Sequence, residues 1–231
     1  MSNFRDCFIQ ARDKSLDNIQ NICRSLLPSD IKNCPWTITD KGGHLGVTIY
    51  DDETQLNAYM AAYIQWHKGK LFHIFENLPL GALNGDISII DWGCGQGMAS
   101  LCLYEYAKKH NLKTKVHEII LIEPSEIALD RAEFILSNID TKANISTINC
   151  KLDEVNENDI KLFNNHKVIH LFSNILDIQG INLKHLSEIL FTNSESDNYV
   201  LCVSPYYPSS GNRRIDAFLK YSSICSPFAL P

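Results

Sequence analysis

The sequence lacks the features that define several common classes of protein. Its 231 residues contain no apolar run long enough to span a membrane, and the charged N-terminal segment lacks the apolar core of a secretory signal. Its eight cysteines never form a CxxC pair, which disfavours a zinc ribbon and, without an export signal, a disulfide framework. Acidic residues outnumber basic ones by 27 to 21, so the net charge of −6 disfavours gripping nucleic acid by charge alone. We therefore expect a cytoplasmic protein with reduced thiols and no membrane partner.

With 45% hydrophobic residues, the chain can bury a core as one compact domain with appendages. We predict that residues 1–80 form an N-terminal helical cap with a short hairpin. Apolar residues recur near the helical period over 4–27, and a continuous apolar stripe over 56–78 is the strongest helix signal in the chain. Two β-branched runs around a Gly-Gly turn predict the hairpin over 36–50.

After residue 81 short apolar runs alternate with helical patterns. The runs lack polar alternation, which is typical of parallel strands that are covered on both faces. Residues 81–231 are therefore predicted to form an α/β core with a doubly wound, mostly parallel sheet, whose ligands bind beyond the carboxyl ends of the strands. The expected strands span 87–91, 118–122, 145–149, 168–172 and 199–203, and the expected helices span 98–110, 125–138, 182–193 and about 212–222.

A glycine-rich segment at 89–98 joins the first expected strand to the following helix. Three glycines alternate in it: Gly93, Gly95 and Gly97. They allow the backbone to turn tightly and to approach a ligand closely. No Gly-Lys-Ser/Thr follows, which excludes a P-loop, and Met98 stands where a dinucleotide-binding frame needs glycine or alanine. Asp91, just before the turn, would repel a pyrophosphate but suits a ligand that carries an ammonium or sulfonium.

In this segment the chain resembles the class I, Rossmann-like methyltransferases that depend on S-adenosyl-L-methionine. Their first motif is an acidic residue followed by GxGxG, which Asp91-Trp-Gly-Cys-Gly-Gln-Gly matches at every defined position. The resemblance covers roughly residues 85–205. It implies S-adenosyl-L-methionine as the cofactor, with Asp91 and the glycine loop at its methionine end and Cys94 as a small residue that fits the loop.

The resemblance extends to the ends of the next two expected strands. Glu123, followed by Pro124, matches the acid that accepts hydrogen bonds from both ribose hydroxyls. Asp153 matches a residue that accepts a hydrogen bond from the adenine amino group, and Leu152 would pack on the base. The family also places a helix over the cofactor before the first strand, so Tyr63 or Lys70 is a candidate for binding the cofactor's carboxylate. The alternative is a helix that only docks on the sheet, with Lys70 in solvent.

The acceptor side is less well defined. Asn174 follows the fourth expected strand, where methyltransferases place residues that face the methyl group, and Tyr206 follows the fifth; both are candidate catalytic residues. Amino-methylating members often carry Asp/Asn-Pro-Pro-Tyr after the fourth strand, whereas this chain has Ser-Asn-Ile-Leu-Asp. A small molecule or a protein is therefore favoured over nucleic acid as the methyl acceptor. No metal site is expected, because His166 and His170 straddle a loop and a strand.

The chain stops short of a complete class I sheet. Seven strands are usual, whereas only nine residues follow the last expected helix, too few for the C-terminal strand hairpin. We expect either a fragment of a longer chain or a shortened variant that forms a homo-oligomer over an exposed edge strand. The alternative function is therefore a catalytically incomplete, methyltransferase-like cofactor-binding or scaffold protein, including a ribosome-associated one. A third alternative is an NAD-dependent oxidoreductase, against which Asp91 and Met98 argue.

Overall fold

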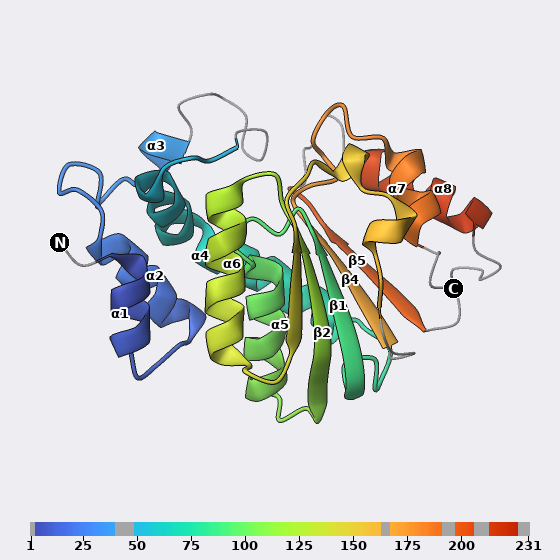
Figure 1. The fold of residues 1–231 in the computed structure, drawn as a ribbon, viewed down its shortest axis with the longest axis horizontal. Helices are drawn as coiled ribbons and strands as arrows, with labels where there is room; N and C mark the ends of the chain where they lie inside the picture. The colour runs from blue at the N-terminus through green and yellow to red at the C-terminus, as the bar shows by residue number, and fades with distance from the viewer. Residues whose placement is uncertain (1–2, 40–48, 163–166, 191–196, 206–212, 226–231) are drawn as a thin grey trace.

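The computed structural model describes residues 3–39, 49–162, 167–190, 197–205 and 213–225. These residues form three layers, with a sheet between two groups of helices (Figure 1). The strands are β1 (Gly85–Trp92), β2 (Thr114–Ile122), β3 (Asn144–Ile148), β4 (Lys167–Ser173) and β5 (Asn198–Val203). The helices are α1 (Phe4–Gln10), α2 (Leu16–Ser25), α3 (Trp36–Thr39), α4 (Glu53–Glu76), α5 (Met98–Lys109), α6 (Glu126–Ile139), α7 (Leu183–Leu190) and α8 (Arg213–Cys225), with 3₁₀ turns at Leu152–Glu154 and Glu157–Asp159.

The five strands of the described sheet lie in the order β3-β2-β1-β4-β5, and every neighbouring pair is parallel. Each predicted strand is therefore present, and the expected doubly wound α/β fold is confirmed. The sequences of the central strands lack polar alternation because these strands are buried on both faces. Ile89 belongs to the core on the side of α5, whereas its neighbour Ile90 belongs to the core on the side of α7.

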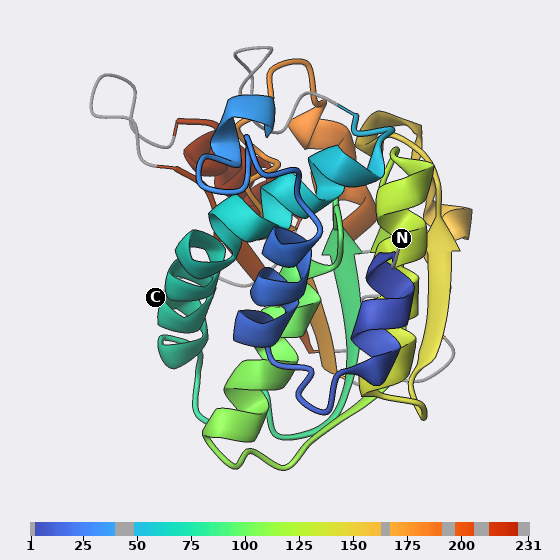
Figure 2. The same ribbon diagram turned by 90° about the vertical axis from the view of Figure 1, so that its left-hand side faces the viewer.

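One face of the sheet carries α4, α5 and α6, and α1 and α2 pack on the outside of these helices. Figure 2 shows α1, α2 and α4 in front of this face. Asp52 caps α4, because its carboxylate accepts hydrogen bonds from the Thr54 and Gln55 backbone amides at 2.7 and 3.1 Å. Phe8 and Ile64 of this layer lie in the same hydrophobic cluster as Ile89 of β1. The N-terminal helices thus share a core with the sheet, and the proposed division at residue 80 stays a prediction.

Two predictions for the N-terminal segment are wrong in part. The single helix expected over 4–27 is two helices, because Ala11 is extended and Ser15 begins α2 by accepting a hydrogen bond from the Asn18 amide. The first run of the expected hairpin, Trp36–Thr39, is the short helix α3. Local bonds override its β-branched composition, since the Thr37 amide and hydroxyl both donate to the Cys34 carbonyl. The second run lies mostly outside the described residues.

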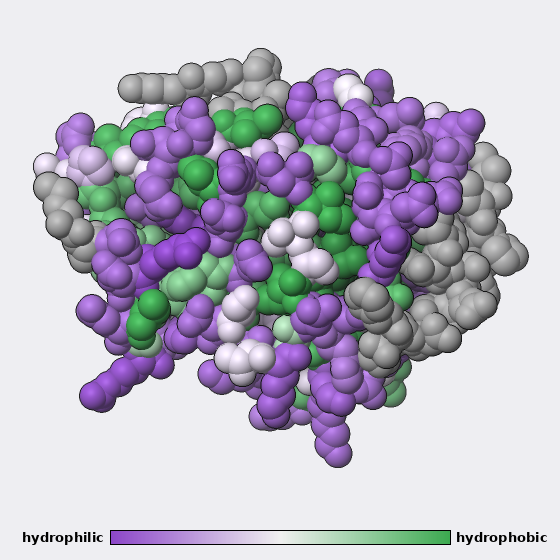
Figure 3. All heavy atoms as spheres, viewed as in Figure 1, coloured by the Kyte–Doolittle hydropathy of each residue, from purple (hydrophilic) through white to green (hydrophobic). Residues whose placement is uncertain are grey.

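The surface is polar over most of its extent in the view of Figure 3, with hydrophobic side chains gathered toward the middle, where Figure 1 shows the strands. Large exposed apolar side chains include Trp66 on α4 and Leu80 after it. Within the described parts of the chain, none of the helices combines the length and apolar character that crossing a membrane requires.

Candidate functional site

The carboxyl ends of three strands meet at one edge of the sheet. Trp92, the last residue of β1, is paired with Ile122 of β2 and with Phe172 of β4. The helix that follows β1 packs on one face of the sheet, and the helix that follows β4 packs on the other. In doubly wound sheets this reversal opens a crevice at which ligands bind. A pocket lies at this point, lined by the loops that follow these three strands and by α4.

The glycine loop follows β1 and forms one side of this pocket. Gly93 has a φ of +65°, and a Cβ there would lie 2.7 Å from the Ile175 side chain, so the loop after β4 can approach only glycine. Gly95 has a φ of +53°, and a Cβ there would meet no atom within 4 Å. Gly93, Cys94 and Gly95 line the pocket, whereas Gly97 begins α5 behind it. The backbone at Gly95 is therefore open to a ligand.

Asp91 lies behind the loop rather than on the pocket lining. It is 1% exposed, and its carboxylate accepts hydrogen bonds from the Ser100 backbone amide at 3.2 Å and the Ser100 hydroxyl at 2.7 Å. It thereby anchors the first turn of α5, since Gly97 at the N-cap offers no side chain. Burial raises the pKa of Asp91 to about 6, although the two Ser100 hydrogen bonds favour its charged form. Asp91 thus holds the loop in place and adds negative charge beneath it.

Glu123 follows β2 and lies against the glycine loop, on the same side of the pocket. One carboxylate oxygen accepts a hydrogen bond from the Gly95 amide, and the other accepts one from the Ser125 amide, both at 3.0 Å. Burial raises the pKa of Glu123, and these two hydrogen bonds oppose the rise. Pro124 lies beside the pocket, where its carbonyl accepts a hydrogen bond from the Asn149 amide group. We call the Gly93–Gly97 loop and Glu123 the floor of the pocket.

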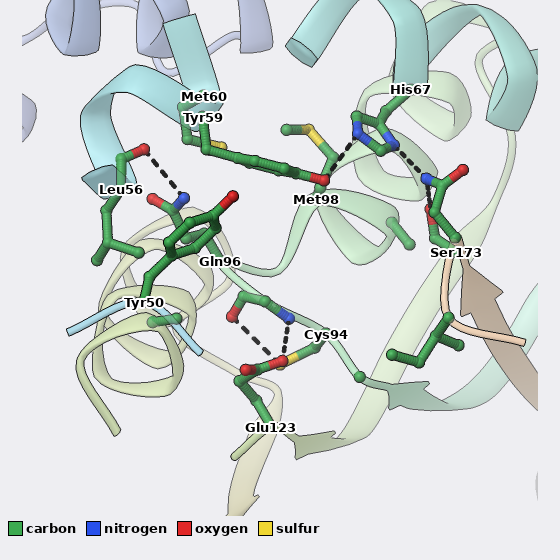
Figure 4. Close-up of a pocket in the computed structure, with 16 residues that line it drawn as sticks. Tyr50, Leu56, Tyr59, Met60, His67, Cys94, Gln96, Met98, Glu123 and Ser173 are labelled. Atoms are coloured by element: carbon green, nitrogen blue, oxygen red, sulfur yellow. Dashed lines mark hydrogen bonds between the residues drawn. The ribbon is translucent and has the colours of Figure 1, made fainter. Parts of the chain in front are cut away.

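Aromatic side chains from the N-terminal segment cover the pocket opposite the floor. Figure 4 shows the ring of Tyr59 lying across the cavity, with Tyr50 beside it and Glu123 and Cys94 on the far side. The Tyr50 and Tyr59 ring centroids are 5.8 Å apart, and the Tyr59 hydroxyl lies 3.0 Å from His67 Nε2. We call Tyr50, Tyr59 and His67 the roof. The sequence places Tyr59 and His67 in the helical stripe but does not single them out as site residues.

Asn174 joins the roof to the end of β4. Its side-chain amide nitrogen lies 2.6 Å from His67 Nδ1, and its side-chain oxygen accepts a hydrogen bond from Lys70 Nζ at 2.5 Å. Its backbone has a φ of +57°, a conformation that asparagine tolerates better than most residues. The predicted site residue Asn174 is therefore on the pocket lining. Lys70 lies behind it and Tyr63 packs against Tyr59 and His67, so neither reaches the lining.

The predicted adenine-binding residues lie away from the pocket lining. Leu152 is buried in the core on the side of α7. Asp153 is exposed and accepts a hydrogen bond from the Asn182 amide at 2.7 Å, just before α7. Their contact with adenine stays a prediction. Tyr206 and His166 lie outside the described residues.

A buried arginine connects the roof helix to the floor. Arg131 of α6 donates hydrogen bonds to the side-chain oxygens of Asn57 at 2.8 Å and Gln96 at 3.1 Å, and it pairs with Glu53. Gln96 belongs to the glycine loop and also donates to the Leu56 carbonyl of α4 at 3.1 Å. The sequence gives no signal for this cluster, because its members come from three elements. It fixes the distance between the glycine loop and the helix that covers it.

Metal-binding residues do not gather in the described part of the chain. No group of three or more His, Cys, Asp or Glu side chains there is placed to hold a metal ion. His170 instead lies in the core, where its ring nitrogens bond to Trp92 Nε1 at 3.2 Å and to the Asn198 side-chain oxygen at 2.9 Å.

No family model matches this chain, and no curated protein matches it. The solved structures that are similar to it include methyltransferases. A methyltransferase from Leishmania major that depends on S-adenosylmethionine is 12% identical, over 76% of this chain and 69% of its own, with a TM-score of 0.45. The methyltransferase PaMTH1 from Podospora anserina, with S-adenosylhomocysteine bound, is 12% identical over 96% of this chain and 92% of its own, with a TM-score of 0.38. At these values the likeness says nothing about what the pocket binds.

Proposed function

We propose that this chain is a methyltransferase that binds S-adenosyl-L-methionine between the floor and the roof of the pocket. The observation that carries the proposal is the pairing of Glu123 with Gly95. An open backbone position and a carboxylate lie 3.0 Å apart at the carboxyl ends of neighbouring parallel strands. This pairing suits a nucleoside, because the backbone leaves room for it and the carboxylate accepts hydrogen bonds from vicinal hydroxyls.

The charges of the site favour this cofactor over a dinucleotide. Asp91 and Glu123 are both acidic, and each lies within hydrogen-bond distance of the glycine loop or of the helix it begins. A pyrophosphate placed on this loop would be repelled by both carboxylates, whereas a sulfonium and an ammonium would be attracted. Met98 occupies the place where the dinucleotide motif needs a small residue, and it lines the pocket. These features disfavour an NAD-dependent oxidoreductase.

The residues of the pocket act by binding and orienting. The bound cofactor would supply a methyl group that its sulfonium already activates, so catalysis needs mainly placement of the acceptor and exclusion of water. The Tyr50 and Tyr59 rings cover the pocket opposite the floor and so exclude water from it (Figure 4). Asn174 lies at the end of β4, on the acceptor side. His67 is unsuited to act as a general base, because both of its ring nitrogens are engaged. We infer an acceptor that needs no deprotonation by this chain, a small molecule or a protein group rather than a nucleic acid.

The test is binding of S-adenosylhomocysteine, the demethylated form of the cofactor, measured by calorimetry. We expect the wild-type protein to bind it and to ignore NADH. Glu123→Gln should weaken binding by about tenfold, because it replaces a charged acceptor of hydrogen bonds with a neutral one. Glu126→Gln is the matched control, since Glu126 is exposed three residues further on. Binding of NADH, or equal affinities in the two variants, would refute the proposal.

A second candidate function is a cofactor-binding scaffold without turnover. It is favoured by Asn174, whose amide is bonded to His67, Ser173 and Lys70 and so offers little to an acceptor. Radiolabelled cofactor incubated with pooled metabolites and proteins separates the two candidates. Transfer of the label establishes a methyltransferase, whereas tight binding with no transfer supports the scaffold.

A further inference from the structure

Four polar side chains form a continuous hydrogen-bonded chain that ends in the roof of the pocket. Lys70 Nζ donates to the Asn174 side-chain oxygen at 2.5 Å. The Asn174 side-chain nitrogen lies 2.6 Å from His67 Nδ1, and His67 Nε2 lies 3.0 Å from the Tyr59 hydroxyl. Lys70, His67 and Tyr59 belong to one helix, whereas Asn174 follows β4. This series of hydrogen bonds therefore runs from the partly buried ammonium of Lys70 to the Tyr59 hydroxyl over the cavity.

The cation at one end fixes the orientation of the amide. An ammonium has only donors, so the atom of Asn174 that faces Lys70 must be the oxygen. The amide nitrogen then faces His67 Nδ1, and because this nitrogen only donates, His67 Nδ1 must accept. Burial lowers the pKa of Lys70, and the nearby Asp177 carboxylate opposes this effect by favouring the charged ammonium.

The amide in turn fixes the tautomer of the imidazole. Burial, with a smaller contribution from Lys70, lowers the pKa of His67 to about 4, so the ring is neutral near pH 7. A neutral imidazole carries one proton, and since Nδ1 accepts from Asn174, that proton lies on Nε2. His67 Nε2 therefore donates to the Tyr59 oxygen. The proton of the Tyr59 hydroxyl is left for another partner.

That proton has no acceptor among the residues that the structure describes, and Tyr59 lines the pocket. Burial also raises the pKa of Tyr59, which keeps the hydroxyl protonated. We propose that Lys70, Asn174 and His67 are positioning residues that hold the Tyr59 hydroxyl as a hydrogen-bond donor toward an oxygen atom of the bound cofactor. The ligand part of this inference rests on the proposed function, whereas the orientation of the chain does not.

The orientation is tested without ligand by ¹⁵N NMR of the histidine rings, with the His67 signals assigned from their loss in His67→Gln. We expect Nε2 of His67 to be protonated and Nδ1 to be unprotonated. Asn174→Asp should reverse this pattern, because a carboxylate only accepts and needs a proton on Nδ1. Aspartate also tolerates the left-handed backbone at this position. A wild-type ring protonated on Nδ1, or a tautomer that stays the same in Asn174→Asp, would overturn the inference.

Lys70→Met tests whether the cation sets the direction of the chain. With the ammonium gone, the amide of Asn174 can turn, and we expect a mixture of the two His67 tautomers. Lys68→Met is the matched control, because Lys68 pairs with Glu105 and Asp17 on another face of the same helix. An unchanged tautomer in Lys70→Met would show that Lys70 is not a positioning residue.

The donor role of Tyr59 is tested by calorimetry with S-adenosylhomocysteine and with an analogue that lacks its carboxylate. Tyr59→Phe should weaken binding of S-adenosylhomocysteine by about tenfold. Tyr104→Phe is the control, since the Tyr104 hydroxyl donates to Asp140. If the partner is the carboxylate, Tyr59→Phe and the wild type bind the analogue equally; if it is another oxygen, the tenfold loss persists. Unchanged affinity for both ligands would overturn the donor role, whereas no binding by the wild type would refute the proposed function and leave the NMR result standing.

Discussion

The floor of the pocket is made largely of backbone from one short stretch, whereas the roof is made of side chains from distant segments. The Gly93–Gly97 loop is contiguous, and its shape follows from the left-handed conformations of its glycines. The roof depends on a contact between His67 and Asn174, which are 107 residues apart. The loop needs particular backbone angles, which few residues can adopt. The roof needs particular hydrogen-bond donors and acceptors from segments that are far apart in the sequence. The sequence alone therefore does not reveal which residues form it.

The sharpest way to break the floor is Gly95→Val. A side chain at this position would enter the pocket, where a Cβ meets no protein atom within 4 Å, and it would occupy the space meant for the ligand. We expect affinity for S-adenosylhomocysteine to fall by about a thousandfold, or about 4 kcal/mol. Calorimetry measures the affinity, and thermal unfolding shows that the variant is folded.

Gly85→Val separates backbone strain from the blocked pocket. Gly85 begins β1, has a φ of +82°, and likewise has no atom within 4 Å of a built Cβ. Both variants should lose about 1–3 kcal/mol of unfolding free energy through strain. Only Gly95→Val should lose affinity, and equal losses of affinity in the two variants would contradict our assignment of the floor.

The floor and the roof should respond to pH in opposite directions. The pKa of Asp91 beneath the floor is raised from 3.8 to about 6, so the folded state binds more protons than the unfolded state between these values, and stability falls as pH rises. The pKa of His67 is lowered from 6.5 to about 4, so the unfolded state binds more protons and stability rises with pH. Each effect amounts to about 3 kcal/mol over its window.

Chemical unfolding between pH 4 and pH 7 checks these signs. Compared with the wild type, Asp91→Asn should raise the slope of stability against pH, and His67→Gln should lower it. His73→Gln, an exposed position on the same helix, should leave the slope as it is. Parallel curves for Asp91→Asn and the wild type would show that Asp91 titrates alike in the folded and unfolded states.

Arg131→Met loosens the connection between floor and roof. The substitution preserves most of the side-chain volume but leaves the oxygens of Asn57 and Gln96 without their buried donor. We expect a loss of about 2 kcal/mol in unfolding free energy, together with a weaker affinity for S-adenosylhomocysteine, because the glycine loop keeps its bond to the Leu56 carbonyl but loses the one that ties it to α6. Arg24→Met is the control, since Arg24 bonds to the Ala61 carbonyl away from the pocket. A loss of affinity in Arg24→Met of the same size would argue against a specific connection.

This difference between floor and roof also explains what the sequence predicts. Strand positions follow from apolar runs such as 168–172, and Gly95 and Glu123 are found because the floor needs residue types that local sequence reveals. Tyr59 and Tyr63 both lie in the helical stripe, and the sequence does not distinguish the residue that lines the pocket, Tyr59, from the predicted one, Tyr63. Which of them faces the cavity depends on how α4 is rotated relative to the sheet, and the sequence does not specify this rotation.

The expected hairpin over 36–50 fails for a related reason. Its first run is rich in β-branched residues, but strand propensity is weak unless a partner strand is present. Hydrogen bonds to the Cys34 carbonyl instead close a helical turn over Trp36–Thr39. Where a partner exists, as at Ile89 between β2 and β4, the same composition gives the predicted strand.

Asn174 satisfies two unrelated demands at once. Its left-handed backbone favours glycine, asparagine or aspartate, and the bonds to Lys70 and His67 require an amide that both accepts and donates. Glycine and aspartate keep the turn but lose the donor, whereas glutamine keeps the amide but not the turn. Asparagine alone meets both conditions, so this position serves as a marker when related chains are compared. A relative with the glycine loop but with Asp or Gly at this position would keep the pocket and lose the hydrogen bond that makes its Tyr59 hydroxyl a donor toward the ligand.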